Sequence, residues 1–195
     1  MENINQSEES MPRAFNVFKT ISKDSFSKME IKFLIDYIIQ THHDFAKKKA
    51  VIIYTLAQKI FYRHSNTYPE MLTINNIIFL FLHDLLNQMK GEEEFLFPRI
   101  RQAANEIKFA EINDTNILQS LKRKRKLLTN NHAKALAYLS TLRQVSNNFD
   151  APPGACNSYK ILFGKIKELE DDLIIHFQLE DNFLFPNGLL IRQND

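Results

Sequence analysis

Apolar residues recur at intervals of three and four along four long stretches of the chain. These stretches cover residues 28–63, 71–96, 117–147 and 157–184, and such spacing predicts amphipathic helices. Only short connections separate them, so the expected fold is all-α, an antiparallel four-helix bundle. We expect residues 26–190 to form this bundle and residues 1–25, which begin with a polar and acidic segment, to be a flexible N-terminal arm.

The scarcity of glycine and proline supports a helical fold. The 195 residues include four glycines and six prolines, and no two glycines lie closer than ten residues. This spacing excludes the glycine-rich loops that bind phosphate groups through the backbone. It also argues against sandwiches and barrels, which need frequent turn residues.

An internal repeat divides the chain into two similar halves. The segment EEEFLFP at residues 92–98 recurs as EDNFLFP at residues 180–186. His43 precedes the first copy, and His132 precedes the second at nearly the same distance along the chain. The proline of each copy predicts the end of a helix. We therefore expect two helical hairpins, each with a histidine on its first helix and a glutamate near the end of its second.

The fourth predicted helix carries two polar residues on its inward face. That face consists of Leu162, Ile166, Leu169, Leu173, His176, Glu180 and Phe183. The pattern calls for leucine at the positions of His176 and Glu180. Burying a carboxylate without a partner costs several kcal/mol. A histidine and a glutamate one turn apart on a buried face are therefore better explained as metal ligands.

The inward faces of the other helices complete a candidate metal site. The second predicted helix presents Ile74, Ile78, Phe81, Leu85, Gln88, Glu92 and Phe95, with Gln88 where the repeat predicts a histidine. His43 and His132 lie on the inward faces of the first and third helices. The expected ligands are therefore His43, Glu92, His132, His176 and Glu180. Three imidazoles and two carboxylates suit two iron or manganese ions bridged by carboxylates, whereas a structural zinc site often uses thiolates and the chain has one cysteine.

Other polar features indicate no further partner. His42 and His83 lie off the inward faces, so we expect both at the surface. The basic run at residues 122–126 is expected to be a solvated helix face, because the net charge is only +2. For the same reason we do not expect nucleic acid as a partner. We do not expect a membrane either, since the apolar runs are too short to span a bilayer. Without a signal-peptide pattern at the N-terminus, the expected location is the cytoplasm.

Several motifs resemble those of a known family. They are NN at 147–148, APPGAC at 151–156, DDL at 171–173, His176, LEDN at 179–182 and LFP at 184–186. In the first half they are II at 38–39, HD at 43–44, QM at 88–89, EE at 92–93 and LFP at 96–98. These residues resemble the hemerythrin-like domain of the repair-of-iron-centres family, over roughly residues 30–190.

The resemblance implies a di-iron site built from four histidines and two bridging glutamates. Glu92 and Glu180 match the bridging glutamates, and the other matching ligands are His43, His132 and His176. The remaining family histidine falls on Gln88, where either the amide oxygen coordinates or water fills the position. Many family members also carry a small domain with adjacent cysteines, and residues 1–30 contain no such pair.

The function implied by the resemblance is repair of damaged iron–sulfur proteins under nitrosative or oxidative stress. The di-iron site would act by donating iron or through chemistry with nitric oxide or dioxygen, and we do not expect a conventional enzyme. Two alternatives stay open. One is a hemerythrin-like sensor of these gases or of iron, and the other is a degenerate bundle that serves as an interaction module. Gln88 is the feature that favours the last.

Overall fold

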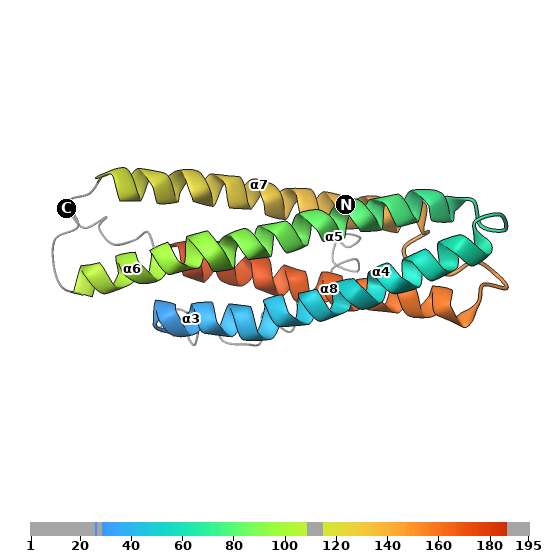
Figure 1. Cartoon of the computed structure of the whole chain (residues 1–195), viewed down its shortest axis with the longest axis horizontal. Helices are drawn as coiled ribbons and strands as arrows, with labels where there is room; N and C mark the ends of the chain where they lie inside the picture. The colour runs from blue at the N-terminus through green and yellow to red at the C-terminus, as the bar shows by residue number, and fades with distance from the viewer. Residues whose placement is uncertain (1–25, 27–28, 109–114, 187–195) are drawn as a thin grey trace, which may run out of the picture.

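The computed structural model describes residue 26 and residues 29–108 and 115–186, and the described chain is helical without strands. Four long helical rods lie side by side and run in alternating directions (Figure 1), which confirms the expected all-α bundle. The first rod comprises α3 (Ile31–Tyr37), η1 (Ile38–His43) and α4 (Asp44–His64). The second comprises α5 (Glu70–Gly91), η2 (Glu92–Leu96) and α6 (Phe97–Lys108). The third is α7 (Thr115–Val145), and the fourth comprises α8 (Asn157–Leu179) and η3 (Glu180–Leu184).

Two apolar clusters fill the bundle, and a polar layer lies between them. α4 packs against α5 and α8, and α5 also packs against α7. On the first rod, the cluster members nearest to the polar layer are Ala46 of one cluster and Ile38 of the other. On the second rod they are Met89 and Leu96. The candidate ligands occupy the positions between these limits. The apolar clusters therefore cover the candidate site from both ends of the bundle.

The segments η1, η2 and η3 are π-helical turns inserted in otherwise α-helical rods. In each, a backbone N–H bonds to the carbonyl five residues back, as Phe97 does to Glu92 and Phe185 does to Glu180. η2 and η3 occupy equivalent positions of the two repeats, so the repeat extends to an unusual backbone feature. Such π turns are frequent at functional sites, and here each contains a candidate ligand.

The prediction that Pro98 ends the second helix is wrong. The rod continues through Pro98 to Lys108. Proline normally breaks a helix because it lacks an N–H group and its ring clashes with a carbonyl in the preceding turn. Here the wider π turn changes the hydrogen-bond register directly before Pro98, which lets the helix accommodate it. Pro186 is also helical, and residues 187–195 lie outside the described residues together with the expected arm at 1–25.

The expected inward position of Phe95 is wrong. Its side chain is 56% exposed, whereas Leu96 and Phe97 point inward and are 5% and 1% exposed. The equivalent residue of η3, Phe183, is 6% exposed and packs against Phe26, so the π turn alone does not expose Phe95. The residues of the fourth predicted face are buried as expected, and so are His43 and His132 on the first and third rods.

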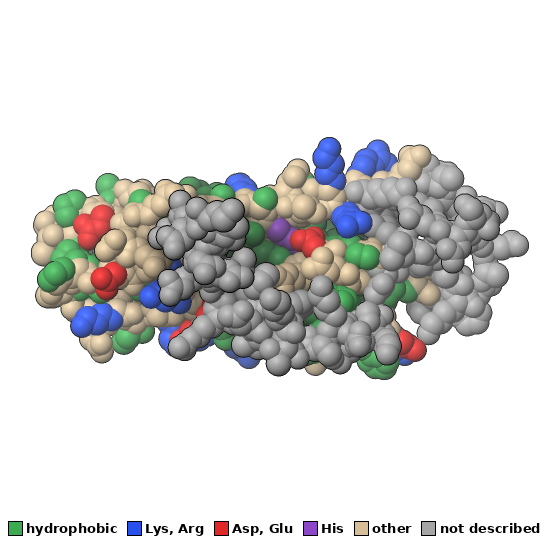
Figure 2. All heavy atoms as spheres, turned by 180° about the vertical axis from the view of Figure 1, so that it is seen from behind, with side chains coloured by type: hydrophobic (Ala, Val, Ile, Leu, Met, Phe, Trp, Pro, Cys, Tyr) green, Lys and Arg blue, Asp and Glu red, His purple; other side chains and the backbone are tan. Residues whose placement is uncertain are grey.

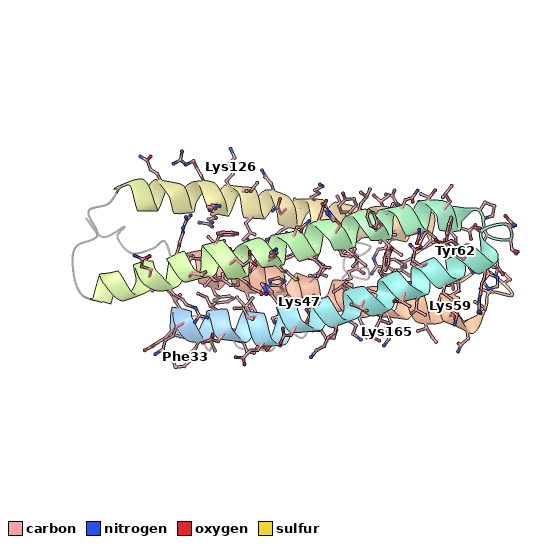
Figure 3. All side chains as sticks on the ribbon, viewed as in Figure 1. Phe33, Lys47, Lys59, Tyr62, Lys126 and Lys165 are labelled. Carbon is pink, nitrogen blue, oxygen red and sulfur yellow. The ribbon has the colours of Figure 1, made fainter. Side chains whose placement is uncertain are left out.

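The surface is mixed in charge. On the face seen from behind, the basic and acidic side chains of the described residues are interspersed (Figure 2). Residues 123–127 are exposed, and Lys126 points away from the bundle (Figure 3), as expected for a solvated face. None of the described helices has an apolar stretch long enough to cross a membrane.

Candidate metal centre

The structure brings all five candidate ligands together in the polar layer. His43 is the last residue of η1, while Glu92 and Glu180 are the first residues of η2 and η3. His176 lies in the last turn of α8, and His132 lies in the second half of α7. No side chain of the five is more than 3% exposed.

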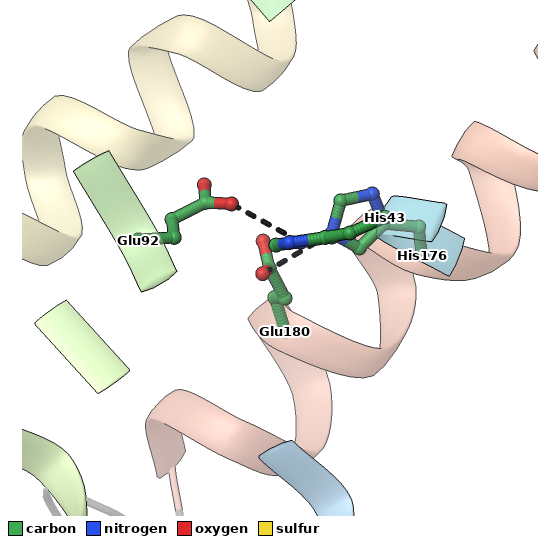
Figure 4. Close-up of side chains that lie close together, drawn as sticks. All are labelled: His43, Glu92, His176 and Glu180. Carbon is green, nitrogen blue, oxygen red and sulfur yellow. Dashed lines mark hydrogen bonds and ion pairs between the residues drawn. The ribbon is translucent and has the colours of Figure 1, made fainter. Parts of the chain in front are cut away.

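Four of these residues converge on one point. His43, Glu92, His176 and Glu180 each offer one ligand atom, and these four atoms lie within 4.8 Å of one another (Figure 4). The Nε2 atom of His43 lies 3.1 Å from Nε2 of His176 and 3.4 Å from Oε2 of Glu92. Nε2 of His176 lies 3.2 Å from Oε1 of Glu180. We call this group the first half-site.

The second carboxylate oxygen of Glu92 and that of Glu180 face away from the first half-site. Oε2 of Glu180 lies 3.0 Å from Nε2 of His132. Oε1 of Glu92 accepts a hydrogen bond from Nε2 of Gln88 at 2.8 Å. We call His132, Gln88 and these two oxygens the second half-site. Each carboxylate is therefore placed between two half-sites, as a bridging ligand would be.

Several buried polar atoms of this centre lack hydrogen-bond partners. Among them are both carboxylate oxygens of Glu180, Oε2 of Glu92 and Nε2 of His132. They approach one another closely, but not in hydrogen-bonding geometry. Leaving a buried polar group unsatisfied costs about 1–3 kcal/mol. A cation between the carboxylates and imidazoles would satisfy these atoms together, so the residues present fit a metal ion.

Two further carboxylates, which the sequence analysis missed, hold the histidines from behind. Nδ1 of His43 donates to Glu93 at 2.6 Å, and Nδ1 of His132 lies 3.2 Å from Oδ2 of Asp181. Glu93 also accepts hydrogen bonds from Lys47 at 2.7 and 2.9 Å, and Lys47 projects from α4 (Figure 3). A bond at Nδ1 fixes the tautomer and orients Nε2 toward a metal. The sequence does carry a signal for them, because in each repeat an acidic residue directly follows the ligand glutamate: Glu93 follows Glu92, and Asp181 follows Glu180.

The electrostatics of the centre favour a cation. Burial alone would lower the pKa of His132, but Asp181 and Glu180 outweigh it and raise the pKa to about 9. Burial alone would raise the pKa of Glu180, but the charge of His176 and the nearby His132 ring lower it to about 2. The glutamate is therefore ionised, and its buried negative charge attracts a positive charge such as a metal ion would supply.

The expectation that His42 lies at the surface is wrong. Its side chain is buried, its Nδ1 donates to Oδ1 of Asp172 at 2.9 Å, and its ring stacks on His176 with centroids 5.8 Å apart. The π turn η1 widens the helix, so that two consecutive histidines reach the interior. His83 is exposed, as expected.

A groove between α5 and α7 leads to the second half-site. It consists of two adjoining pockets of about 270 and 210 Å³. Both pockets are lined by Asn87, Gln88 and Asn131, and the smaller one also reaches Glu92. The second half-site therefore borders a depression that opens to the surface.

Comparison with known proteins gives a family-level match, although no family model matches the chain. Curated proteins named iron-sulfur cluster repair protein YtfE come from Escherichia coli O81 (strain ED1a), Escherichia coli (strain K12 / DH10B) and Shigella boydii serotype 18 (strain CDC 3083-94 / BS512). Each is 28% identical to this chain over 156 residues, which is 80% of its length. The match covers 65% of the length of those relatives. These findings confirm the resemblance to iron–sulfur cluster repair proteins.

Proposed function

We propose that this chain binds two iron ions and acts in the repair of damaged iron–sulfur clusters under nitrosative or oxidative stress. The observation that carries the proposal is the Glu180 carboxylate. It is fully buried, neither of its oxygens has a hydrogen-bond partner, and the oxygens face imidazoles on opposite sides, His176 and His132. The relatives' printed name supports cluster repair as the process.

The chain would hold one ion in each half-site. His43 and His176 would bind the first ion, His132 would bind the second, and Glu92 and Glu180 would bridge them. Bound iron would supply a store for donation to damaged clusters, or open coordination positions for nitric oxide or dioxygen. Manganese is the alternative ion, because imidazoles and carboxylates suit both metals.

The surrounding residues would prepare this site for the ions. Glu93 and Asp181 orient two of the imidazoles, and their negative charges add to those of the bridging glutamates. Lys47 offsets part of that charge at the first half-site. The apolar clusters cover the polar layer from both ends of the bundle. The partners that we propose are damaged iron–sulfur proteins, with nitric oxide or dioxygen as small ligands.

The experiment that tests this function has two parts. Anaerobic equilibrium titration with ferrous iron, followed by metal analysis, should show up to two ions per chain. The loaded protein should then restore activity to an iron–sulfur enzyme inactivated by nitric oxide, while a His176→Ala variant should restore much less. Protein that binds no iron would refute the proposal and favour an interaction module. Reversible spectral changes with nitric oxide but no recovered activity would favour a gas sensor.

A further inference from the structure

The two half-sites differ in the donors that they offer. The first provides two imidazoles and two carboxylate oxygens, and both of its histidines are 0% exposed. The second provides one imidazole, that of His132, because Gln88 occupies the position that corresponds to His176 in the repeat. Imidazole is a good ligand for iron, whereas amide carbonyl oxygens suit harder ions such as calcium and magnesium.

Gln88 also forms a hydrogen bond with one of the carboxylate oxygens that would bridge the two ions. Its amide N–H donates to Oε1 of Glu92 at 2.8 Å. To turn the amide oxygen toward an ion, the Gln88 side chain would have to rotate and break this bond. If the bond stays, Oε1 of Glu92 divides its electron density between the amide and the ion. In both arrangements an ion at the second half-site is held by fewer or weaker donors than an ion at the first.

The second half-site is also closer to solvent. Gln88 is 9% exposed and lines both pockets of the groove between α5 and α7, together with Asn87 and Asn131. These polar side chains offer amide oxygens along the groove that can replace water around a departing cation. The charged lining residues are Asp84 and Lys134, which pair at 2.7 Å, and Lys124 of the smaller pocket. An ion at the second half-site therefore has a polar route to the surface, with the amide groups closest to Glu92.

We propose that the second half-site is the exchangeable one, an inference that rests on the iron-binding function proposed above. The first half-site retains its ion, and the second takes up and releases a ferrous ion through the groove between α5 and α7. The ion delivered to a damaged cluster is then the one held by His132, and Gln88 is the residue that makes it labile.

Release of iron to a chelator tests this proposal directly. Protein loaded anaerobically with two equivalents of ferrous iron is mixed with excess ferrozine, and the coloured complex is followed with time. Loss of even an outer partner of a ligand changes metal affinity about 10- to 100-fold, so the two ions should leave in two phases at least about tenfold apart in rate. Gln88→His should slow the fast phase by at least about tenfold. Asn76→His adds an exposed histidine elsewhere on α5 and should change neither phase.

Single replacements of the histidines assign the phases. His132→Ala should remove the fast phase and keep the slow one, and His43→Ala should remove the slow phase. Two ions released at one rate, or a fast phase unchanged by Gln88→His, would overturn the proposal while leaving iron binding intact. Protein that binds no iron would overturn the function itself. If Gln88→His does not fold by circular dichroism, the wild type and His132→Ala decide the question.

Discussion

Replacing Glu93 with alanine should weaken metal binding at the first half-site without unfolding the bundle. Glu93 accepts the Nδ1–H of His43 at 2.6 Å, so the variant frees the imidazole to rotate and to change tautomer. Losing such a partner costs a metal site about 10- to 100-fold in affinity, which corresponds to about 1.4–2.8 kcal/mol. The ion pair of Glu93 with Lys47 is partly exposed, and such pairs contribute at most about 1 kcal/mol to stability.

The assay is a titration of the metal-free protein with cobalt(II), a spectroscopically visible substitute for iron. The matched control is Glu94→Ala, which removes the adjacent, exposed glutamate that pairs only loosely with Lys90 at 3.9 Å. The control should bind cobalt as the wild type does, and thermal melts of both variants should differ little from the wild type. Wild-type cobalt affinity in Glu93→Ala would refute the assignment of Glu93 as the residue that orients His43.

Three further predictions concern stability and pH. Gly91→Ala should raise the free energy of unfolding by up to about 1 kcal/mol in a denaturant titration, because Gly91 is helical and an added Cβ meets no atom within 4 Å; a loss of stability would contradict this reasoning. Arg143→Ala should lower the free energy of unfolding by about 3 kcal/mol, because it leaves the buried Glu170 without its charged partner, and adding Glu170→Gln should recover part of the loss. Burial alone would lower the pKa of His132, but neighbouring carboxylates raise it to about 9. A metal must displace that proton, so calorimetry should show proton release on cobalt binding and an affinity that rises from pH 7 to 9; equal affinities would contradict it.

The spacing of apolar residues left some contacts of the site undetermined, namely those of Glu93, Asp181 and His42. Helical spacing identifies residues that point inward, and it placed the candidate ligands correctly in the interior. It does not identify partners that come from different helices. His43 meets Glu93, and His42 meets Asp172, only because separate rods pack side by side at that level of the bundle.

The sequence alone determined the helical class, the repeat of two hairpins and the five residues that gather at the polar layer. Those features follow from local spacing, because residues three and four apart share a helix face in any α-helical packing. Only the tertiary structure decided the exposure of Phe95 and the position of the π turns, one of which lets the helix continue through Pro98. A π turn is a single-turn insertion within an α-helix, and the spacing of apolar residues by three and four predicts the helix but does not locate such a turn.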